Sequence, residues 1–114
     1  MDASDDEFLV SDFAAAEVAS ALSRLVRMQE LDREDAHQRL ATFDAWLVLD
    51  ATCVDLEPRD IRQAAALVRR FELRLRTPDA LHVAICARLA ASMVTRDANL
   101  AHAASAIGLA TIPL

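Results

Sequence analysis

Glycine occurs only once in these 114 residues, at Gly108, and proline occurs three times. Turn-rich all-β folds depend on both residues. Their scarcity here argues against a sandwich or barrel. Apolar residues make up 54% of the chain, with Ala and Leu dominant, which favours helices around a hydrophobic core. The length suits one domain over residues 1–114, and the polar residues 1–7 are expected to be disordered.

Short oxygen side chains, prolines and acids mark five helix starts. Ser11 or Asp12, Asp32 and Asp97 are suited to accept a hydrogen bond from the first turn of a helix. Glu57-Pro58 and Thr77-Pro78-Asp79 place a proline where its missing N–H costs nothing. These signals predict helices over 12–29, from 32, from 57, over 77–91 and over 98–107, the last ending at Gly108.

Short apolar runs lie between these helices. They predict strands at 8–10, 92–95 and 109–112, and a strand or connector at 48–54. Strands that alternate with helices indicate an α/β fold with a short parallel sheet covered by helices. Apolar residues at helical spacing mark the expected inward faces of the first three helices. These faces are Val18, Leu22, Leu25 and Val26; Leu40, Phe43, Trp46 and Leu47; and Ile61, Ala64, Ala65 and Val68. The two cysteines, Cys53 and Cys86, are expected to be buried thiols.

The formal net charge is −6, and all twelve basic residues are arginines. Affinity for phosphate comes largely from basic side chains, so an RNA-binding role needs a local basic patch, a metal ion or a basic partner. Four arginines crowd the end of the third helix and the following loop: Arg69, Arg70, Arg74 and Arg76. The acidic N-terminus does not resemble a signal peptide, and no apolar run is long enough to cross a bilayer. We therefore expect a cytoplasmic protein that does not associate with a membrane.

Three acids stand out by position, namely Glu17, Asp79 and Asp97. Each lies near the start of a helix, and Asp97 directly follows a strand. Ligands of open α/β sheets bind outside the carboxyl ends of the strands, so these carboxylates are expected to converge there. Convergent carboxylates repel one another unless a cation binds them, and Mg²⁺ or Mn²⁺ prefers such oxygen ligands. Such a cation favours hydrolysis of a phosphodiester.

Each acid also has an ordinary structural interpretation. Asp79 at a helix N-terminus is stabilised by the helix dipole alone, and Asp97 is an ordinary N-cap. Glu17 flanks an apolar stripe and is equally consistent with a solvated helix residue. The residues alone therefore leave open a structural or dimerisation domain without chemistry.

Three segments together resemble the PIN-domain family. They are Ser-Asp-Phe-Ala-Ala-Ala-Glu-Val-Ala-Ser-Ala-Leu at 11–22, Leu-Arg-Thr-Pro-Asp-Ala-Leu-His-Val-Ala at 75–84, and Val-Thr-Arg-Asp-Ala-Asn-Leu at 94–100. They occur in the family's order, and the resemblance covers residues 8–114. It implies a three-layer α/β/α fold in which Glu17, Asp79 and Asp97 are three of four catalytic metal ligands for Mg²⁺ or Mn²⁺. It further implies that Arg96 contacts substrate phosphate. His82, one helical turn after Asp79, is expected to be a packing or hydrogen-bonding residue rather than a base.

The nearest group it resembles is the toxin subunit of VapBC-type toxin–antitoxin pairs. The resemblance implies a small, dimeric, Mg²⁺-dependent endoribonuclease that an antitoxin holds inactive. The RNA substrate, an antitoxin-like basic peptide and a second copy of the chain are then the expected partners.

The family's opening strand, which ends in the first catalytic Asp, has no counterpart in this sequence. The chain begins at about the later strand, so we expect an N-terminally truncated fold with weak or no activity. A misplaced start, a degenerate fragment and element exchange in a dimer all remain open. The alternative is a non-catalytic binding or dimerisation module whose acidic pocket takes an Arg-rich antitoxin-like peptide.

Overall fold

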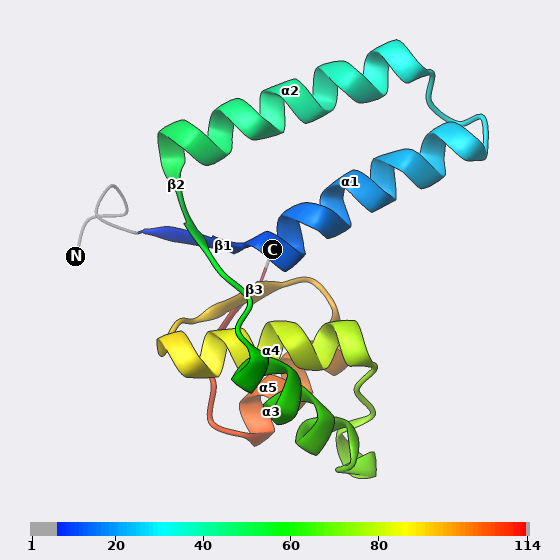
Figure 1. The fold of residues 1–114 in the computed structure, drawn as a ribbon. Coiled ribbons are helices and arrows are strands. Elements are labelled where there is room, and N and C mark those ends of the chain that lie inside the picture. The colour runs from blue at the N-terminus through cyan, green and yellow to red at the C-terminus, as the bar shows by residue number, and fades with distance from the viewer. Residues whose placement is uncertain (1–6, 114) are drawn as a thin grey trace. The chain divides into compact units, whose positions relative to one another are not determined.

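The computed structural model describes residues 7–113. The expected disorder of residues 1–7 therefore falls, apart from Glu7, outside the described residues. The chain divides into two compact units, Met1–Leu56 (the first unit) and Glu57–Leu114 (the second unit) (Figure 1). The single domain expected over 1–114 stays a prediction.

The first unit is a helical hairpin with one pair of strands. Figure 1 shows the two helices side by side, joined by a short turn. Strand pairing is parallel and runs from Phe8 opposite Ala51 to Ser11 opposite Val54. The elements are β1 (Phe8–Ser11), α1 (Asp12–Arg27), α2 (Arg33–Asp50) and β2 (Ala51–Val54).

Side-chain caps begin both helices of the first unit, as the sequence predicts. Ser11 Oγ accepts from the backbone N–H of Ala14 at 2.9 Å, which leaves Asp12 free of the capping role. Asp12 instead accepts through Oδ1 from the Leu56 N–H at 2.9 Å, so the start of α1 holds the segment after β2. Asp32 Oδ1 caps α2 by accepting from the Asp35 N–H at 2.8 Å.

Among the described residues of the first unit, only Ser11 and Ala36 are buried. Two helices and two strands enclose too little volume to exclude water fully. The apolar faces predicted for α1 and α2 are accordingly half-buried rather than buried. Trp46 is the centre of a small aromatic cluster, with its ring centroid 6.1 Å from that of Phe8 and 6.2 Å from that of Phe43.

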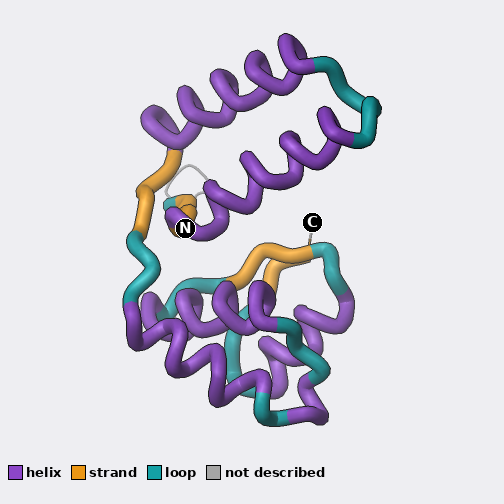
Figure 2. Tube along the Cα trace, turned by 45° about the vertical axis from the view of Figure 1, so that its right-hand side comes forward, coloured by secondary structure: helices purple, strands orange, loops and turns teal. Residues whose placement is uncertain are grey.

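The second unit packs three helices with a second strand pair (Figure 2). β3 and β4 pair in parallel, from Met93 opposite Thr111 to Thr95 opposite Pro113. Its elements are α3 (Pro58–Val68), the short 3-10 helix η2 (Phe71–Leu73), α4 (Thr77–Leu89), β3 (Met93–Thr95), α5 (Ala98–Ala106) and β4 (Thr111–Pro113). Its buried apolar residues are Ala64, Leu67, Leu73, Leu75, Ala80, Leu81, Val83, Ala84, Ile85, Met93, Leu100, Ala103 and Ala104.

Gly108 ends α5 as predicted. Its φ of +90° lies in the left-handed region that favours glycine. Its N–H donates to the Ser105 carbonyl at 3.0 Å, and the Leu109 N–H donates to the Ala104 carbonyl at 3.0 Å. These bonds close the last turn of the helix. Because Leu109 takes part in this turn, β4 starts later than predicted and covers 111–113 rather than 109–112.

Other boundaries also differ from the prediction, including the end of α1, which lies at Arg27 rather than at residue 29. Residues 48–50 are the end of α2, because β1 offers partners only from Ala51 onward. Helix α4 ends at Leu89, two residues early, because Ala90 turns left-handed with φ of +52°. Thr77 is the first residue of α4 and not its cap, since the extended residue Arg76 precedes it and accepts from the Ala80 N–H at 2.9 Å.

The inward face of α3 is also rotated from the prediction. Asp60, Ala64 and Leu67 are buried, whereas Ile61 is 54% exposed and Ala65 is exposed. The reason is an ion pair between Asp60 and Arg88 of α4, which turns the acid toward the neighbouring helix.

The predicted buried thiols are wrong for Cys53 and partly right for Cys86. Cys53 lies in β2 and is exposed, because this two-stranded sheet leaves its side chain uncovered. Cys86 is half-buried in α4, and burial raises the pKa of its thiol.

The α/β class with short parallel sheets is confirmed. Within residues 7–113 the four strands form two separate pairs, β1 with β2 and β3 with β4. A single three-layer arrangement stays a prediction. None of the helices described there is both long enough and apolar enough to cross a bilayer.

Candidate functional site

Asp97 lies at the carboxyl end of β3 and begins α5. Its Oδ1 accepts from the Leu100 N–H at 3.0 Å, and its own N–H donates to Thr95 Oγ1 at 3.1 Å. The Thr-Arg-Asp sequence therefore forms a tight turn from β3 into α5. The predicted N-cap is confirmed, and the acid is at the strand end where α/β sites form.

Asp79 lies in the first turn of α4, where its charge complements the helix dipole. It is half-buried. The next residue, Ala80, and four others of this helix are buried in the core of the second unit. The helix that carries Asp79 is therefore the most enclosed one, which gives the carboxylate a well-anchored backbone.

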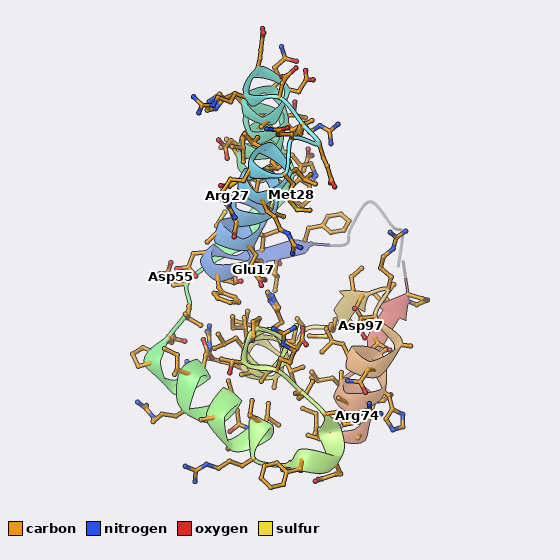
Figure 3. All side chains as sticks on the ribbon, turned by 90° about the vertical axis from the view of Figure 1, so that its right-hand side faces the viewer. Glu17, Arg27, Met28, Asp55, Arg74 and Asp97 are labelled. Carbon is orange, nitrogen blue, oxygen red and sulfur yellow. The ribbon has the colours of Figure 1, made fainter. Side chains whose placement is uncertain are left out.

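One hydrogen bond links the segments that carry these two acids. The Asn99 side chain in the first turn of α5 donates through Nδ2 to the Arg74 carbonyl at 3.1 Å. Arg74 closes η2 in the left-handed region, at φ of +57°, just ahead of α4. The start of α5 is thus tied to the loop that leads into α4. Figure 3 shows Arg74 and Asp97 in the second unit.

Glu17 comes from the other unit. It is half-buried on α1 of the first unit, whereas Asp79 and Asp97 belong to the second unit. Within either unit, the described part of the chain has no group of three His, Cys, Asp or Glu side chains arranged to hold a metal ion. The convergence of Glu17 with Asp79 and Asp97 stays a prediction.

The two other residues singled out by sequence flank these acids. Arg96 is exposed and immediately precedes Asp97. His82 is half-buried on α4, one turn after Asp79. Their roles in phosphate contact and packing stay predictions.

A scan against protein-family models matches residues 1–106 of the chain to the PIN domain. The chain belongs to the PIN domain family. A search of curated proteins found no match. The matched range, 1–106, differs at both ends from the range 8–114 over which the sequence resembles the family. It includes Glu17, Asp79 and Asp97. Membership indicates a nuclease-like function, which in this family generally depends on divalent metal ions.

The donor chemistry of the PIN-domain acids suits such an ion. Carboxylate oxygens are the ligands that Mg²⁺ and Mn²⁺ prefer. The capping bond of Asp97 uses Oδ1, and a carboxylate can accept through its second oxygen at the same time. Half-buried Asp79 and exposed Asp97 both remain within reach of solvent and of a hydrated cation. The second unit of this PIN domain therefore offers two compatible ligands.

Sequence reasoning missed the charged cluster that joins α3 to α4. Arg88 binds Asp60 through two bonds, Nε to Oδ1 at 2.8 Å and Nη2 to Oδ2 at 3.0 Å. Arg88 Nη1 also lies 2.6 Å from Glu57 Oε2, and Asp60 Oδ2 accepts from the Glu57 N–H at 2.8 Å. The bonds from Arg88, then the backbone N–H of Glu57, hold the pKa of Asp60 below its ordinary value of 3.8, against the opposing effect of burial.

A partial signal for this cluster is present in the sequence. Asp60 stands three residues after Glu57, the spacing at which a helix residue reaches back to the N-cap backbone. Nothing in the sequence pairs Asp60 with Arg88, which follows 28 residues later. The cluster is structural, because it lies at the end of α4 opposite to Asp79.

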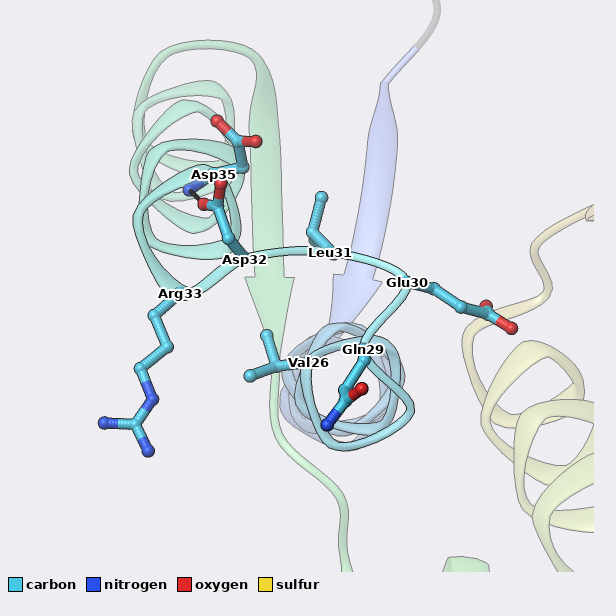
Figure 4. Close-up of a pocket in the computed structure, with 7 residues that line it drawn as sticks. All are labelled: Val26, Gln29, Glu30, Leu31, Asp32, Arg33 and Asp35. Carbon is cyan, nitrogen blue, oxygen red and sulfur yellow. Dashed lines mark hydrogen bonds between the residues drawn. The ribbon is translucent and has the colours of Figure 1, made fainter.

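An open hollow lies at the turn between α1 and α2 (Figure 4). Neither Glu17 nor the acids of the second unit line it. It is open to solvent and lined mainly by polar side chains from the turn, so we assign no chemistry to it. Its lining residues are Val26, Gln29, Glu30, Leu31, Asp32, Arg33 and Asp35.

Proposed function

We propose that this PIN domain derives from a Mg²⁺- or Mn²⁺-dependent endoribonuclease of the VapBC toxin type and acts in the cytoplasm. The observation that carries the proposal is the placement of Asp79 and Asp97 at the starts of α4 and α5, with the start of α5 bonded through Asn99 to Arg74 in the loop before α4. Both acids lie in family-like segments within the matched range. Glu17 is the third proposed ligand.

Each residue has a stated role in this proposal. Asp79, Asp97 and Glu17 would hold the cation, and Arg96 would bind a phosphate oxygen of the RNA. The cation would supply Lewis-acid polarisation of the phosphodiester and an activated water. The N-cap bond to Leu100 fixes the Asp97 carboxylate in one orientation, which a ligand requires.

We further propose that the 114-residue chain is weakly active or inactive. It offers three acids where the family resemblance implies four, and no residue before Phe8 rebuilds the Asp-Thr-Ser or Asp-Ser-Ser sequence of that first ligand. Fewer carboxylates lower the affinity of the site for a divalent cation.

The test is RNA cleavage by this chain with Mn²⁺, with EDTA, and with the Asp97→Asn variant. Weak cleavage that needs both Mn²⁺ and Asp97 supports the nuclease proposal. Cleavage that persists in Asp97→Asn or in EDTA contradicts it. Vigorous metal-dependent cleavage contradicts only the proposed loss of activity. If the chain is silent, adding an upstream strand that carries an Asp should restore activity.

A second candidate is a non-catalytic module that binds an Arg-rich, antitoxin-like peptide. The favouring observation is the charge of the first unit, which has thirteen acidic residues against four arginines. Such a surface attracts a basic peptide through charge-assisted hydrogen bonds. Titration of a labelled Arg-rich peptide tests it, and an Arg-free peptide of equal length is the control. Equal binding of both peptides counts against this candidate.

We also propose that the PIN domain forms a homodimer. Val48 and Leu49, at the end of α2, are 82% and 79% exposed, which is unusual for adjacent large apolar residues. Sedimentation velocity over a range of concentrations measures the mass of the particle. A monomer at every concentration contradicts the dimer.

A further inference from the structure

The charge of this acidic protein is divided unevenly between its two units. The first unit carries a formal charge of −9 and the second carries +3, with five acids and eight arginines. Two of those five acids, Glu57 and Asp60, are already engaged with Arg88. The second unit is therefore the part of the chain with the net positive charge that RNA binding favours.

Arginines are concentrated at one place in the second unit, between the end of α3 and the start of α4. Arg70 is neutralised there by Glu72, with Nε 3.1 Å from Oε1. Arg74 and Arg76 are exposed, and their guanidinium groups pair with no acid in residues 7–113. These two residues, called the arginine pair below, are available to an external anion.

The backbone holds the arginine pair beside both acids of the candidate site. The Arg74 carbonyl accepts from Asn99, two residues after Asp97. Arg76 is the N-cap residue of α4, three residues before Asp79, and its carbonyl accepts from the Ala80 N–H. The left-handed turn at Arg74 and the helix start at Arg76 thus fix the backbone position of each arginine.

We propose that the arginine pair binds backbone phosphates of single-stranded RNA next to the acids Asp79 and Asp97. The planar guanidinium group forms paired hydrogen bonds to phosphate oxygens. This inference rests on the proposed nuclease function and adds its substrate-positioning residues. An acidic peptide is the less favoured ligand, because under the proposed function the two carboxylates beside the arginines act on RNA and have no role toward a peptide.

The test is fluorescence anisotropy of a short labelled single-stranded RNA in EDTA, which separates binding from cleavage. The Arg74→Gln/Arg76→Gln variant should raise Kd on the order of tenfold or more. The slope of log K against log salt should fall in magnitude by roughly 1.4, for two lost phosphate contacts on a single strand. Arg74→Lys/Arg76→Lys should retain most of the affinity, because it keeps the charge.

The matched control is Arg33→Gln/Arg39→Gln, which removes the same charge from exposed positions of α2. It should leave Kd within about twofold of wild type. Circular dichroism should show equal helix content in all variants. Equal losses in the two Gln variants would overturn the inference, as would wild-type protein that does not bind RNA.

Two outcomes separate this inference from the proposed function. Cleavage that needs Asp97 but is unchanged in Arg74→Gln/Arg76→Gln overturns the arginine pair and leaves the nuclease intact. Binding that depends on the arginine pair without metal-dependent cleavage supports the arginine pair and removes the nuclease. An acidic peptide that displaces RNA and binds tighter than RNA would overturn the choice of ligand.

Discussion

The Asp60 carboxylate of α3 and the Arg88 guanidinium of α4 form a two-bond ion pair within the second unit, across 28 residues of sequence. The Asp60 side chain is 2% exposed and that of Arg88 is 16% exposed. A buried acid is tolerated only when it is paired and hydrogen-bonded, and Arg88 and the Glu57 N–H meet that need. The pair fixes α3 against the helix that carries Asp79.

Replacing Asp60 by Asn should destabilise the protein by about 3 kcal/mol, because Arg88 loses a buried counter-charge and a two-bond partner. The shift in the urea midpoint measures this effect. The matched control is Arg59→Gln, which removes a pair with Glu57 whose side chains are 63% and 37% exposed. That control should cost less than about 1 kcal/mol. Equal midpoints for the two variants would mean that Asp60 and Arg88 are not held together in solution.

The same pair predicts a dependence of stability on pH. The folded-state pKa of Asp60 is depressed below the ordinary value of 3.8, chiefly by Arg88. A depressed pKa contributes stability above the unfolded-state value, and this contribution is lost as pH falls through the folded-state value. The difference in urea midpoint between wild type and Asp60→Asn should therefore be full near neutral pH and shrink below pH 3.8. A difference that stays constant on acidification would contradict the depressed pKa.

Local signals in the sequence predicted most elements, because caps act within a few residues. Ser11, Asp32 and Asp97 accept from backbone N–H groups three residues later, as expected from their side chains. Gly108 takes the left-handed conformation that its position after a helix favours. Where no side chain marks a boundary, as between Asp50 and Ala51, strand pairing with β1 decides it.

Contacts distant in sequence could not be predicted in the same way. The inward face of α3 follows from Asp60 meeting Arg88, and the position of the arginine pair follows from Asn99 binding the Arg74 carbonyl. Both depend on which helices pack together. The acids Asp79 and Asp97 were placed correctly at helix starts, since motif and cap coincide there. Their convergence with Glu17 depends on tertiary structure and stays a prediction.

The aromatic cluster of the first unit should stabilise it measurably. Phe8→Ala removes the ring that lies 6.1 Å from Trp46, at a cost of about 1 kcal/mol. Trp46 is the only tryptophan, so its emission should also change. Phe71→Ala is the matched control, because Phe71 is 83% exposed and has no ring contact among residues 7–113. Its free energy of unfolding, measured with urea, should stay within about 0.5 kcal/mol of wild type. Equal effects of the two truncations would contradict the cluster.

The two roles given to Asp97 can be separated by two substitutions. Asn keeps a side-chain oxygen that caps α5, so Asp97→Asn should change stability little while it abolishes any metal-dependent cleavage. Ala removes both roles, so Asp97→Ala should lose cleavage and also about 1 kcal/mol of stability. Thermal unfolding and RNA cleavage with Mn²⁺ are measured on the same samples.

Asp32 provides the matched control, because it caps α2 through the same bond that Asp97 makes in α5. Asp32→Ala should lower stability by a similar amount, about 1 kcal/mol, and Asp32→Asn should not. Neither change should alter cleavage, since Asp32 lies in the turn between α1 and α2 and belongs to no family-like segment. If Asp97→Asn cleaves RNA as well as wild type does, Asp97 is only a helix cap. If cleavage follows stability across all four variants, the acid acts through the fold rather than as a ligand.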